Sequence, residues 1–456
     1  MQVARMTEAP RENDRFRVVG PIGAMGIVVA SMVGSGIFSL SGQFGASLGT
    51  PTNFMAPWIL GGILALCGGL SLAELGAMIP CSGGSVEFAR RAFGATVGYL
   101  VAMVTILSGY FLSLAVVALL MAQYIDNLFD ADLPQHAIAA TAIVIAFVSQ
   151  LPGLRAGYAF NTALSMVKVV FVAAFVIAGL LWPVSTRLTA PVTQDAPGLF
   201  SAAIASATLV VSFAYLGWST GADIAGDIKH PGRNVPRAII GAIALVFVLY
   251  IGVNLVYLRV IDPAAMTGND DGGLDAIGAV AAKLLFGETL GSAMTAVIAL
   301  LFFSTIVSGT ITSARILESM ARAREIPAAL GVRRSDGVPV AALILTVVAS
   351  LLALFLGSLN DILELLVVLV NVFSSLSIAA VIVLRRTMPD APRPFRVPLY
   401  PFTPLLYLAL AGWSIVASVI DGGSNAILAC AITVAILLII KPLLVPRRSS
   451  STTPLA

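Results

Sequence analysis

The run Gly-Ser-Gly at residues 34–36 interrupts an apolar stretch that extends from residue 22 to about residue 40. Glycine costs a helix about 0.8–1.0 kcal/mol relative to alanine at an interior position, so two glycines in three residues indicate a break in a membrane-crossing helix. Unpaired backbone groups survive at membrane depth only where protein or a water-filled cavity satisfies them. The alternative is an unbroken helix whose small residues form a packing face.

A second apolar stretch carries a similar interruption. Its sequence SFAYLGWSTGAD (212–223) places Gly217 and Gly221 around a Trp-Ser-Thr segment and ends in Asp223. The two interrupted stretches are the first and the sixth along the chain. Interruptions at corresponding positions of two halves are typical of transporter binding sites built on inverted repeats, and five spans per repeat turn the second copy upside down.

A break in the first stretch has a specific binding chemistry. It leaves the backbone N–H groups of Ser35, Gly36 and Ile37 without helical acceptors, at the positive end of a half-helix. Such a cluster binds a carboxylate without a cationic side chain. Glycine suits this place because the backbone must approach the ligand closely. We therefore expect these three residues to bind the carboxylate of a substrate.

The composition indicates which elements hold these residues. Of the 456 residues, 58% are hydrophobic and 11% are charged, and the mean hydropathy is +0.98, whereas soluble proteins average about 25% charged residues. We therefore expect an all-α integral membrane protein. Apolar runs of about 20 residues predict twelve spans, separated by polar segments such as 80–91, 226–237 and 385–398. The spans are expected near 20–43, 55–78, 95–125, 137–151, 159–182, 198–225, 235–259, 289–319, 339–357, 361–384, 402–420 and 425–444.

Positively charged residues set the expected orientation. With the N-terminus in the cytoplasm, 22 of the 26 lysines and arginines fall in cytoplasmic segments, and only Arg187, Arg259 and Lys283 fall outside. This bias follows the positive-inside rule and predicts a multi-pass inner (plasma) membrane protein with both termini cytoplasmic. The expected segments are a tail (1–18), a transporter core (19–384, with repeats at about 19–182 and 198–384), a loop with two helices (385–445) and a second tail (446–456).

Five segments carry a family resemblance. They are VGSGIF (33–38), LAELGAMIPCSGGSVEFARRAFG (72–94), FAYLGWSTGADIAGDIKHPGRNVPRAI (213–239), SARILESMARAREIP (313–327) and LRRTMPDAPRPFRVPLYP (384–401). Together they resemble amino acid–polyamine–organocation (APC) transporters over about residues 18–445. The resemblance implies a five-plus-five inverted repeat with discontinuous helices 1 and 6, two additional C-terminal helices, and transport of amino acids or related amines. The RPFRVP loop and the Gly-Trp pair at 217–218 favour the amino acid permease and exchanger branches.

The resemblance also implies the remaining contacts to substrate. The carbonyls of Met32, Phe213 and Leu216 would accept hydrogen bonds from the substrate ammonium group. The Phe213 ring, at the break, is either a lid over the substrate or a packing aromatic. The pocket for the substrate's side chain indicates the class of amino acid. If this pocket carries no formal charge, neutral amino acids are expected, because burying an uncompensated guanidinium or second carboxylate costs several kcal/mol. The residues that would line it, on spans three and eight, are all uncharged: Ser108, Gly109, Ser113 and Gly309.

Lys168 lies about ten residues into the fifth span, where a cation without a partner costs at least about 2.5–3.5 kcal/mol. One interpretation is that its side chain snorkels to the interface. The other rests on the resemblance, since some APC members carry a lysine in span five where sodium-coupled relatives bind sodium between spans one and eight. Lys168 would then contact carbonyls near Ala30 and Val33. It would also contact a hydroxyl such as Thr305 or Ser308, and transport would not need sodium.

Two acids have structural as well as functional interpretations. Asp223 either flanks the pocket or serves as a structural cap or ion-pair partner. Glu74, like Arg90 and Arg91, borders the loop between the second and third spans. We expect a cytoplasmic ion pair or gating contact there rather than chemistry.

A transporter is favoured over other classes of membrane protein. An intramembrane enzyme needs a nucleophile–base pair or paired acids, and the sequence has no HExxH motif. A channel needs a polar ring along a pore. The predicted function is therefore a sodium-independent secondary transporter of amino acids, with neutral ones favoured, working by alternating access through proton coupling or exchange. A cationic amino acid or polyamine antiporter is the alternative. The expected partners are the amino acid substrate, protons or a counter-substrate, and the lipid bilayer; no cofactor, metal or nucleic acid is expected.

Overall fold

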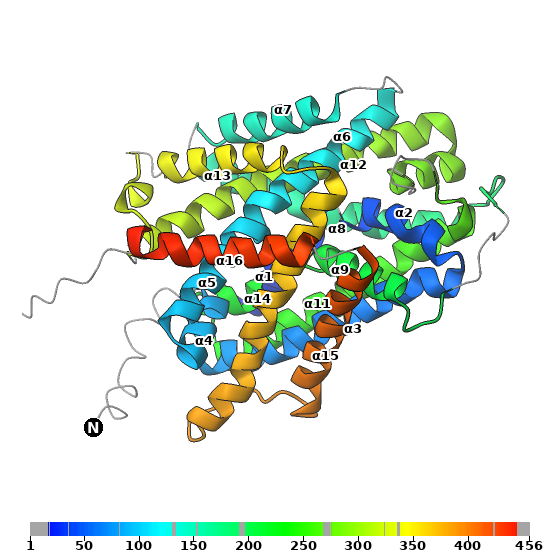
Figure 1. Cartoon of the computed structure of the whole chain (residues 1–456). Helices are drawn as coiled ribbons and strands as arrows, with labels where there is room; N and C mark the ends of the chain where they lie inside the picture. The colour runs from blue at the N-terminus through cyan, green and yellow to red at the C-terminus, as the bar shows by residue number, and fades with distance from the viewer. Residues whose placement is uncertain are drawn as a thin grey trace, which may run out of the picture.

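The chain forms a bundle of helices in the computed structural model (Figure 1). Within the described part of the chain, extended pairing is limited to two isolated bridges, Val19 with Ile228 and Leu188 with Ile261. The structure describes residues 17, 19–34, 36–81, 83–129, 134–151, 154–190, 197–267, 274, 276–322, 324–334, 338–422 and 425–444.

The helices follow one another with short connections. In chain order they are α1 (Pro21–Met32), α2 (Gly36–Leu48), α3 (Pro51–Met78), α4 (Gly84–Phe93), α5 (Ala95–Ile106), the π-helix η3 (Leu107–Leu112), α6 (Ser113–Phe129), α7 (Gln135–Val148), α8 (Leu154–Leu181), α9 (Ala202–Ala214), α10 (Thr220–Asp223), α11 (Pro231–Val260), η4 (Pro263–Ala265), α12 (Ile277–Arg322), η5 (Ala328–Gly331), α13 (Val340–Ala353), α14 (Leu359–Thr387), α15 (Phe402–Gly422) and α16 (Asn425–Leu444).

Each of the twelve apolar segments expected from the sequence contains an α-helix. Among the described residues, six helices are long and apolar enough to cross a membrane by length and composition: α3, the continuous α5–α6 segment, α11, α12, α14 and α15. The pair α1 and α2, bent by 41°, makes a seventh if it is one span, and five shorter apolar helices lie in α7, α8, α9, α13 and α16. The chain is therefore an all-helical integral membrane protein.

Both predicted interruptions are present. α1 ends at Met32, and the next residue, Val33, is extended with φ −72° and ψ 97°. α2 begins at Gly36. In the sixth apolar stretch, α9 ends at Ala214 and a turn over residues 215–219 leads into the short α10. The alternative of an unbroken first helix with a small-residue face is therefore wrong.

Two elements were not expected from the sequence. The segment 80–91, interpreted as a polar connection, contains most of the helix α4, because Phe88 and Ala89 are fully buried while Glu87 and Arg91 pair on its outer side. The third apolar stretch is not a regular helix, since its middle forms the π-helix η3. π-Helical turns inside α-helices are frequent at functional sites, and this one contains Ser108.

The first interrupted helix packs in the interior of the bundle. α11 packs along both α3 and α1, α6 packs along α12, and α9 lies between α3 and α15. α16 packs against α14 and α5 (Figure 1). Large aromatic side chains fill the centre around the breaks, and Trp58, Tyr250 and Tyr257 are completely buried.

Candidate functional site

The two helix breaks pack directly against each other. A Cβ atom added to Gly36 would lie 2.8 Å from both Cα and Cβ of Ala214, the last residue of α9. Gly217 has φ +106°, and a Cβ added there would lie 2.6 Å from the backbone of Ser31 and 2.9 Å from the nitrogen of Met32. No side chain fits in such spaces without moving the neighbouring backbone. The glycines therefore allow the two breaks to meet at one point.

A single tyrosine hydroxyl joins the carbonyl ends of both interrupted helices. Tyr250 Oη, on α11, lies 2.8 Å from the carbonyl oxygen of Met32 and 2.9 Å from that of Ala214. The backbone of Gly34 hydrogen-bonds the same hydroxyl, and the Tyr250 ring packs edge-on against Trp58. Because the carbonyl end of a helix carries partial negative charge, two negative ends converge here. This arrangement attracts a hydrogen-bond donor or an ammonium group.

Tyr250 belongs to a polar stripe on α11 that sequence reasoning missed. Asn254 Oδ1 accepts a hydrogen bond of 2.6 Å from Ser41 Oγ, and Tyr257 Oη donates one of 3.1 Å to the carbonyl of Ile37. Residues 250, 254 and 257 are spaced four and three apart, which places them on one helix face. That spacing of polar groups in an otherwise apolar span is the signal that would have found them. The stripe holds the first interrupted helix at three places.

The three predicted carbonyl acceptors differ in their availability. The carbonyl of Met32 is bonded to Tyr250, and that of Phe213 accepts from the Leu216 N–H at 3.1 Å. Among the described residues, no donor is bonded to the carbonyl of Leu216. Since a carbonyl oxygen has two lone pairs, Met32 keeps one acceptor position, whereas the carbonyl of Phe213 also accepts from the Tyr215 N–H. Binding of a substrate ammonium by these carbonyls stays a prediction.

The predicted amide donors lie at the start of α2. The first four N–H groups of a helix have no acceptor within that helix, and Gly36 and Ile37 are its first two residues. Ser35, the third predicted donor, lies outside the described residues. The positive end of α2 therefore adjoins the contact between the breaks, and carboxylate binding there stays a prediction.

The predicted pocket-lining residues occupy different environments. Ser108 is fully buried, and its hydroxyl donates back to the carbonyl of Val104 at 2.6 Å. A Cβ added to Gly109 would meet only one atom, at 3.9 Å, whereas one added to Gly309 would lie 2.8 Å from Leu114 Cδ2. The absent side chain at Gly309 thus makes room for α6. Gly109 is the one of these glycines with open space beside it.

Lys168 is buried, with 3% of its surface exposed, and its Nζ lies 2.9 Å from Thr305 Oγ1 on α12. The Thr305 hydroxyl itself donates to the carbonyl of Leu301 at 3.0 Å, so its lone pairs face the ammonium group. The burial contradicts snorkelling, and the expected contact with the eighth span is confirmed. In the part of the chain described, Lys168 has no carboxylate partner and no hydrogen bond to the carbonyls of Ala30 or Val33. The second expected contact is therefore absent.

Asp223 caps a helix. Its Oδ1 accepts from the Ser85 N–H at 2.9 Å and from Ser85 Oγ at 2.6 Å, and its carbonyl accepts from the Gly83 N–H at 2.8 Å. Ser85 is the second residue of α4, where an acceptor carboxylate satisfies a free N–H and complements the helix dipole. The capping interpretation is confirmed, and the cap ties the sixth apolar stretch to the loop before α4.

Glu74 is the centre of a buried ion-pair cluster. Its carboxylate accepts from Arg385 Nε and from the Val397 N–H, at 2.8 and 2.7 Å, and Arg393 Nε lies 3.4 Å away. The side chain of Glu74 is completely buried. The expected ion pair at this edge is confirmed, but its partners come from α14 and the 388–398 loop rather than from α4.

Fold and site together define a class of protein. Two interrupted helices meet inside an apolar bundle and present polar backbone there, which is the arrangement of a secondary transporter. No three His, Cys, Asp or Glu side chains are grouped as metal ligands in the described residues. Residues 19–436 match the amino acid permease family. The chain belongs to this family and is a membrane transporter rather than an enzyme, and its resemblance to APC transporters is confirmed.

Curated relatives cover most of the chain. It is 26% identical to the serine/threonine exchanger SteT of Bacillus subtilis over 403 residues, 87% of this chain and 90% of the relative. It is 28% identical to the large neutral amino acids transporter small subunit 2 of Mus musculus, over 86% of this chain and 74% of the relative. It is 27% identical to the b(0,+)-type amino acid transporter 1 of Mus musculus, over 88% of this chain and 82% of the relative.

Proposed function

We propose that this permease is a sodium-independent secondary transporter of neutral amino acids that alternates access around the two helix breaks. The contact between Gly36 and Ala214 carries the proposal, because it brings a positive helix start next to a negative helix end. An α-amino acid carries a carboxylate and an ammonium group on one carbon atom, which suits that pair of charges. The carboxylate would bind the N–H groups of Ser35, Gly36 and Ile37, and the ammonium the Leu216 carbonyl.

The proposed architecture has twelve spans, as a five-plus-five inverted repeat followed by two helices. The packing supports it: α3 packs on α11, and α6 on α12, so the second and third spans each contact the span five later. The contact of α1 with α11 has its counterpart in that of α9 with α3. The repeats would cover about 19–182 and 198–384, and α15 and α16 would follow, with both termini cytoplasmic in the plasma (inner) membrane.

Neutral substrates are supported by the uncharged side chains predicted around the breaks. The one acid close to them, Asp223, is engaged as a helix cap. Two relatives are named as transporters of serine and threonine or of large neutral amino acids. A cationic amino acid or polyamine as best substrate is the alternative outcome of the competition test below.

The proposed sodium independence rests on Lys168. Its ammonium group ties α8 to α12 through Thr305, and Ser308 lies one turn further along the same helix. A fixed positive charge at this place removes the need for a bound cation. We further propose exchange as the transport mode, in keeping with a relative named as an exchanger. Proton coupling is the other mode that the experiment distinguishes.

Proteoliposomes containing the purified protein test these proposals. Uptake of labelled serine should be equal in sodium and choline buffers, should require unlabelled amino acid inside the vesicles, and should not respond to a pH gradient. Uptake that requires sodium would refute the assignment of Lys168. Uptake into vesicles without internal amino acid, driven by a pH gradient, would replace exchange by proton coupling.

A competition panel in the same vesicles tests the substrate. Neutral amino acids should compete best, and amino acid amides or decarboxylated amines should compete at least about tenfold worse, because the N–H cluster then has no anion to bind. If lysine, arginine or glutamate competes best, the neutral assignment is wrong. Equal competition by agmatine-like amines would favour the polyamine alternative.

A further inference from the structure

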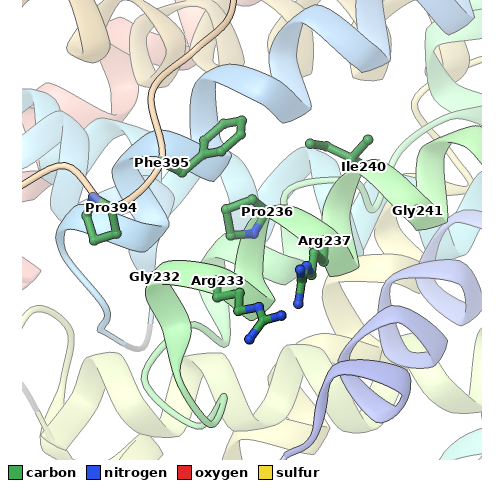
Figure 2. Close-up of a pocket in the computed structure, with 8 residues that line it drawn as sticks. All are labelled: Gly232, Arg233, Pro236, Arg237, Ile240, Gly241, Pro394 and Phe395. Carbon is green, nitrogen blue, oxygen red and sulfur yellow. The ribbon is translucent and has the colours of Figure 1, made fainter.

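A pocket of about 530 Å³ opens where α11 begins. Arg233 and Arg237, one turn apart on α11, line it together with Ile240 of the same helix and with Pro394 and Phe395 of the loop before α15. Figure 2 shows both arginine side chains projecting from the same side of α11, with Phe395 of the loop on the side of Pro236 and Ile240.

Both arginines are exposed, and neither has a hydrogen bond or ion pair within the described part of the chain. This distinguishes them from Arg385 and Arg393, which are bound to the buried carboxylate of Glu74. Two guanidinium groups held one turn apart and left without a carboxylate form a site for a doubly hydrogen-bonding anion such as a phosphate.

The other wall of the pocket is held in place from the protein interior. A Cβ added to Gly232 would lie 2.7 Å from Pro394 Cβ, so the loop rests directly on the start of α11. Arg393 Nη2 donates to the carbonyls of Leu384 and Met388, and the Val397 N–H is bonded to Glu74. The pocket is therefore preformed, since its two walls are fixed by contacts that do not involve a ligand.

An apolar track leads from the arginines along the membrane-facing side of α11. Leu245, Val248 and Leu255 are exposed, with Val248 the most exposed at 65%. Val248 and Leu255 lie about three and five turns from Arg237, which places them on the same helix face as that arginine. A ligand with an anionic head and a long apolar tail matches both parts of this surface.

We propose that this pocket binds the phosphate headgroup of an anionic phospholipid, with one acyl chain lying along α11. Charge complementarity favours a lipid of net negative charge over a zwitterionic one, because the two arginines have no acidic partner among the described residues. Basic pockets between membrane helices on the cytoplasmic side are suited to such headgroups. The orientation proposed above places the pocket in that leaflet, but the binding itself is independent of substrate and of transport mode.

Lipid binding to the purified full chain in detergent tests the proposal. Native mass spectrometry with added phosphatidylglycerol or phosphatidylcholine gives the apparent affinity, and the melting temperature gives a second readout. Phosphatidylglycerol should bind more tightly and raise the melting temperature more. The double variant Arg233→Gln/Arg237→Gln should weaken phosphatidylglycerol binding by about tenfold or more while leaving phosphatidylcholine binding unchanged.

A matched control removes two other exposed arginines that have no partner among the described residues, in Arg324→Gln/Arg386→Gln. It should retain the preference for phosphatidylglycerol. Equal affinity of wild type and the pocket variant, or an equal loss in the control, would overturn the proposal. So would stabilisation by inorganic phosphate or glycerol 3-phosphate as large as that by the lipid, since the site would then serve a soluble anion. A fall in melting temperature of the pocket variant that is the same with every lipid would also overturn it, and would indicate an acidic segment of the chain in the pocket.

Discussion

Replacing Tyr250 by phenylalanine tests the arrangement of the two helix breaks. The change removes the hydroxyl that lies 2.8 Å from the Met32 carbonyl and 2.9 Å from the Ala214 carbonyl, and it leaves the ring in place. A buried acceptor that loses its donor costs about 1–3 kcal/mol. One shared proton serves both carbonyls, so we take about 2 kcal/mol in total, which corresponds to roughly 30-fold in an equilibrium constant.

We expect this loss to appear in substrate affinity, because the hydroxyl fixes both carbonyl ends at the place where the ammonium group would bind. The apparent Kd of the preferred amino acid should rise about 10-fold to 30-fold in Tyr250→Phe. The measurement is a thermal-shift titration of the purified protein, in which a ligand that binds only the folded state raises the melting temperature with concentration.

The matched control is Tyr257→Phe. Tyr257 is equally buried on the same helix, but its hydroxyl bonds the single carbonyl of Ile37 and does not join the two breaks. It should lower the melting temperature with little change in Kd. Wild-type or tighter binding by Tyr250→Phe would refute the reasoning, since the hydroxyl would then compete with the ammonium group instead of positioning its acceptors.

Three further substitutions probe other parts of the structure. Gly36→Ala should abolish ligand-induced stabilisation, because the added Cβ would meet the backbone of α9. The control Gly26→Ala should bind the ligand normally, since the space around Gly26 is open. Similar binding by both variants would mean that the two helix breaks separate easily. Lys168→Met should reduce uptake at least about tenfold without loss of the folded protein. A lysine within a membrane span is costly to bury and is therefore retained for function. Normal uptake by the variant would assign Lys168 a packing role only. Glu74→Gln should destabilise the protein by about 3 kcal/mol or more in denaturant unfolding, because buried guanidinium groups lose their counter-charge. The control Glu87→Gln, in a partly exposed ion pair, should cost less than about 1 kcal/mol of stability. Equal costs would show that burial does not determine the strength of these ion pairs.

The sequence by itself determined the helical membrane fold and the places where two helices are interrupted. Hydropathy, helix propensity and the positions of glycine are local properties, so residues 34–36 and Gly217 indicate the breaks without any knowledge of their surroundings. The five motif segments between residues 33 and 401 together indicated the family. For Lys168 the sequence left snorkelling and a buried contact open, since a charge in an apolar span must reach water or a partner. The expected contact with Thr305 or Ser308 came from the family resemblance.

Only the tertiary structure decided which groups meet at the breaks. Tyr250 lies 218 residues from Met32, and Glu74 lies 311 residues from Arg385, so their hydrogen bonds depend on how the spans pack. An apolar span shows which of its residues are polar but not which backbone groups those residues face. For the same reason the sequence left Asp223 with two interpretations, and the position of Ser85 beside it made it a helix cap. A contact between distant segments is set by the complementary shapes and charges of both partners, and no local pattern contains the second partner.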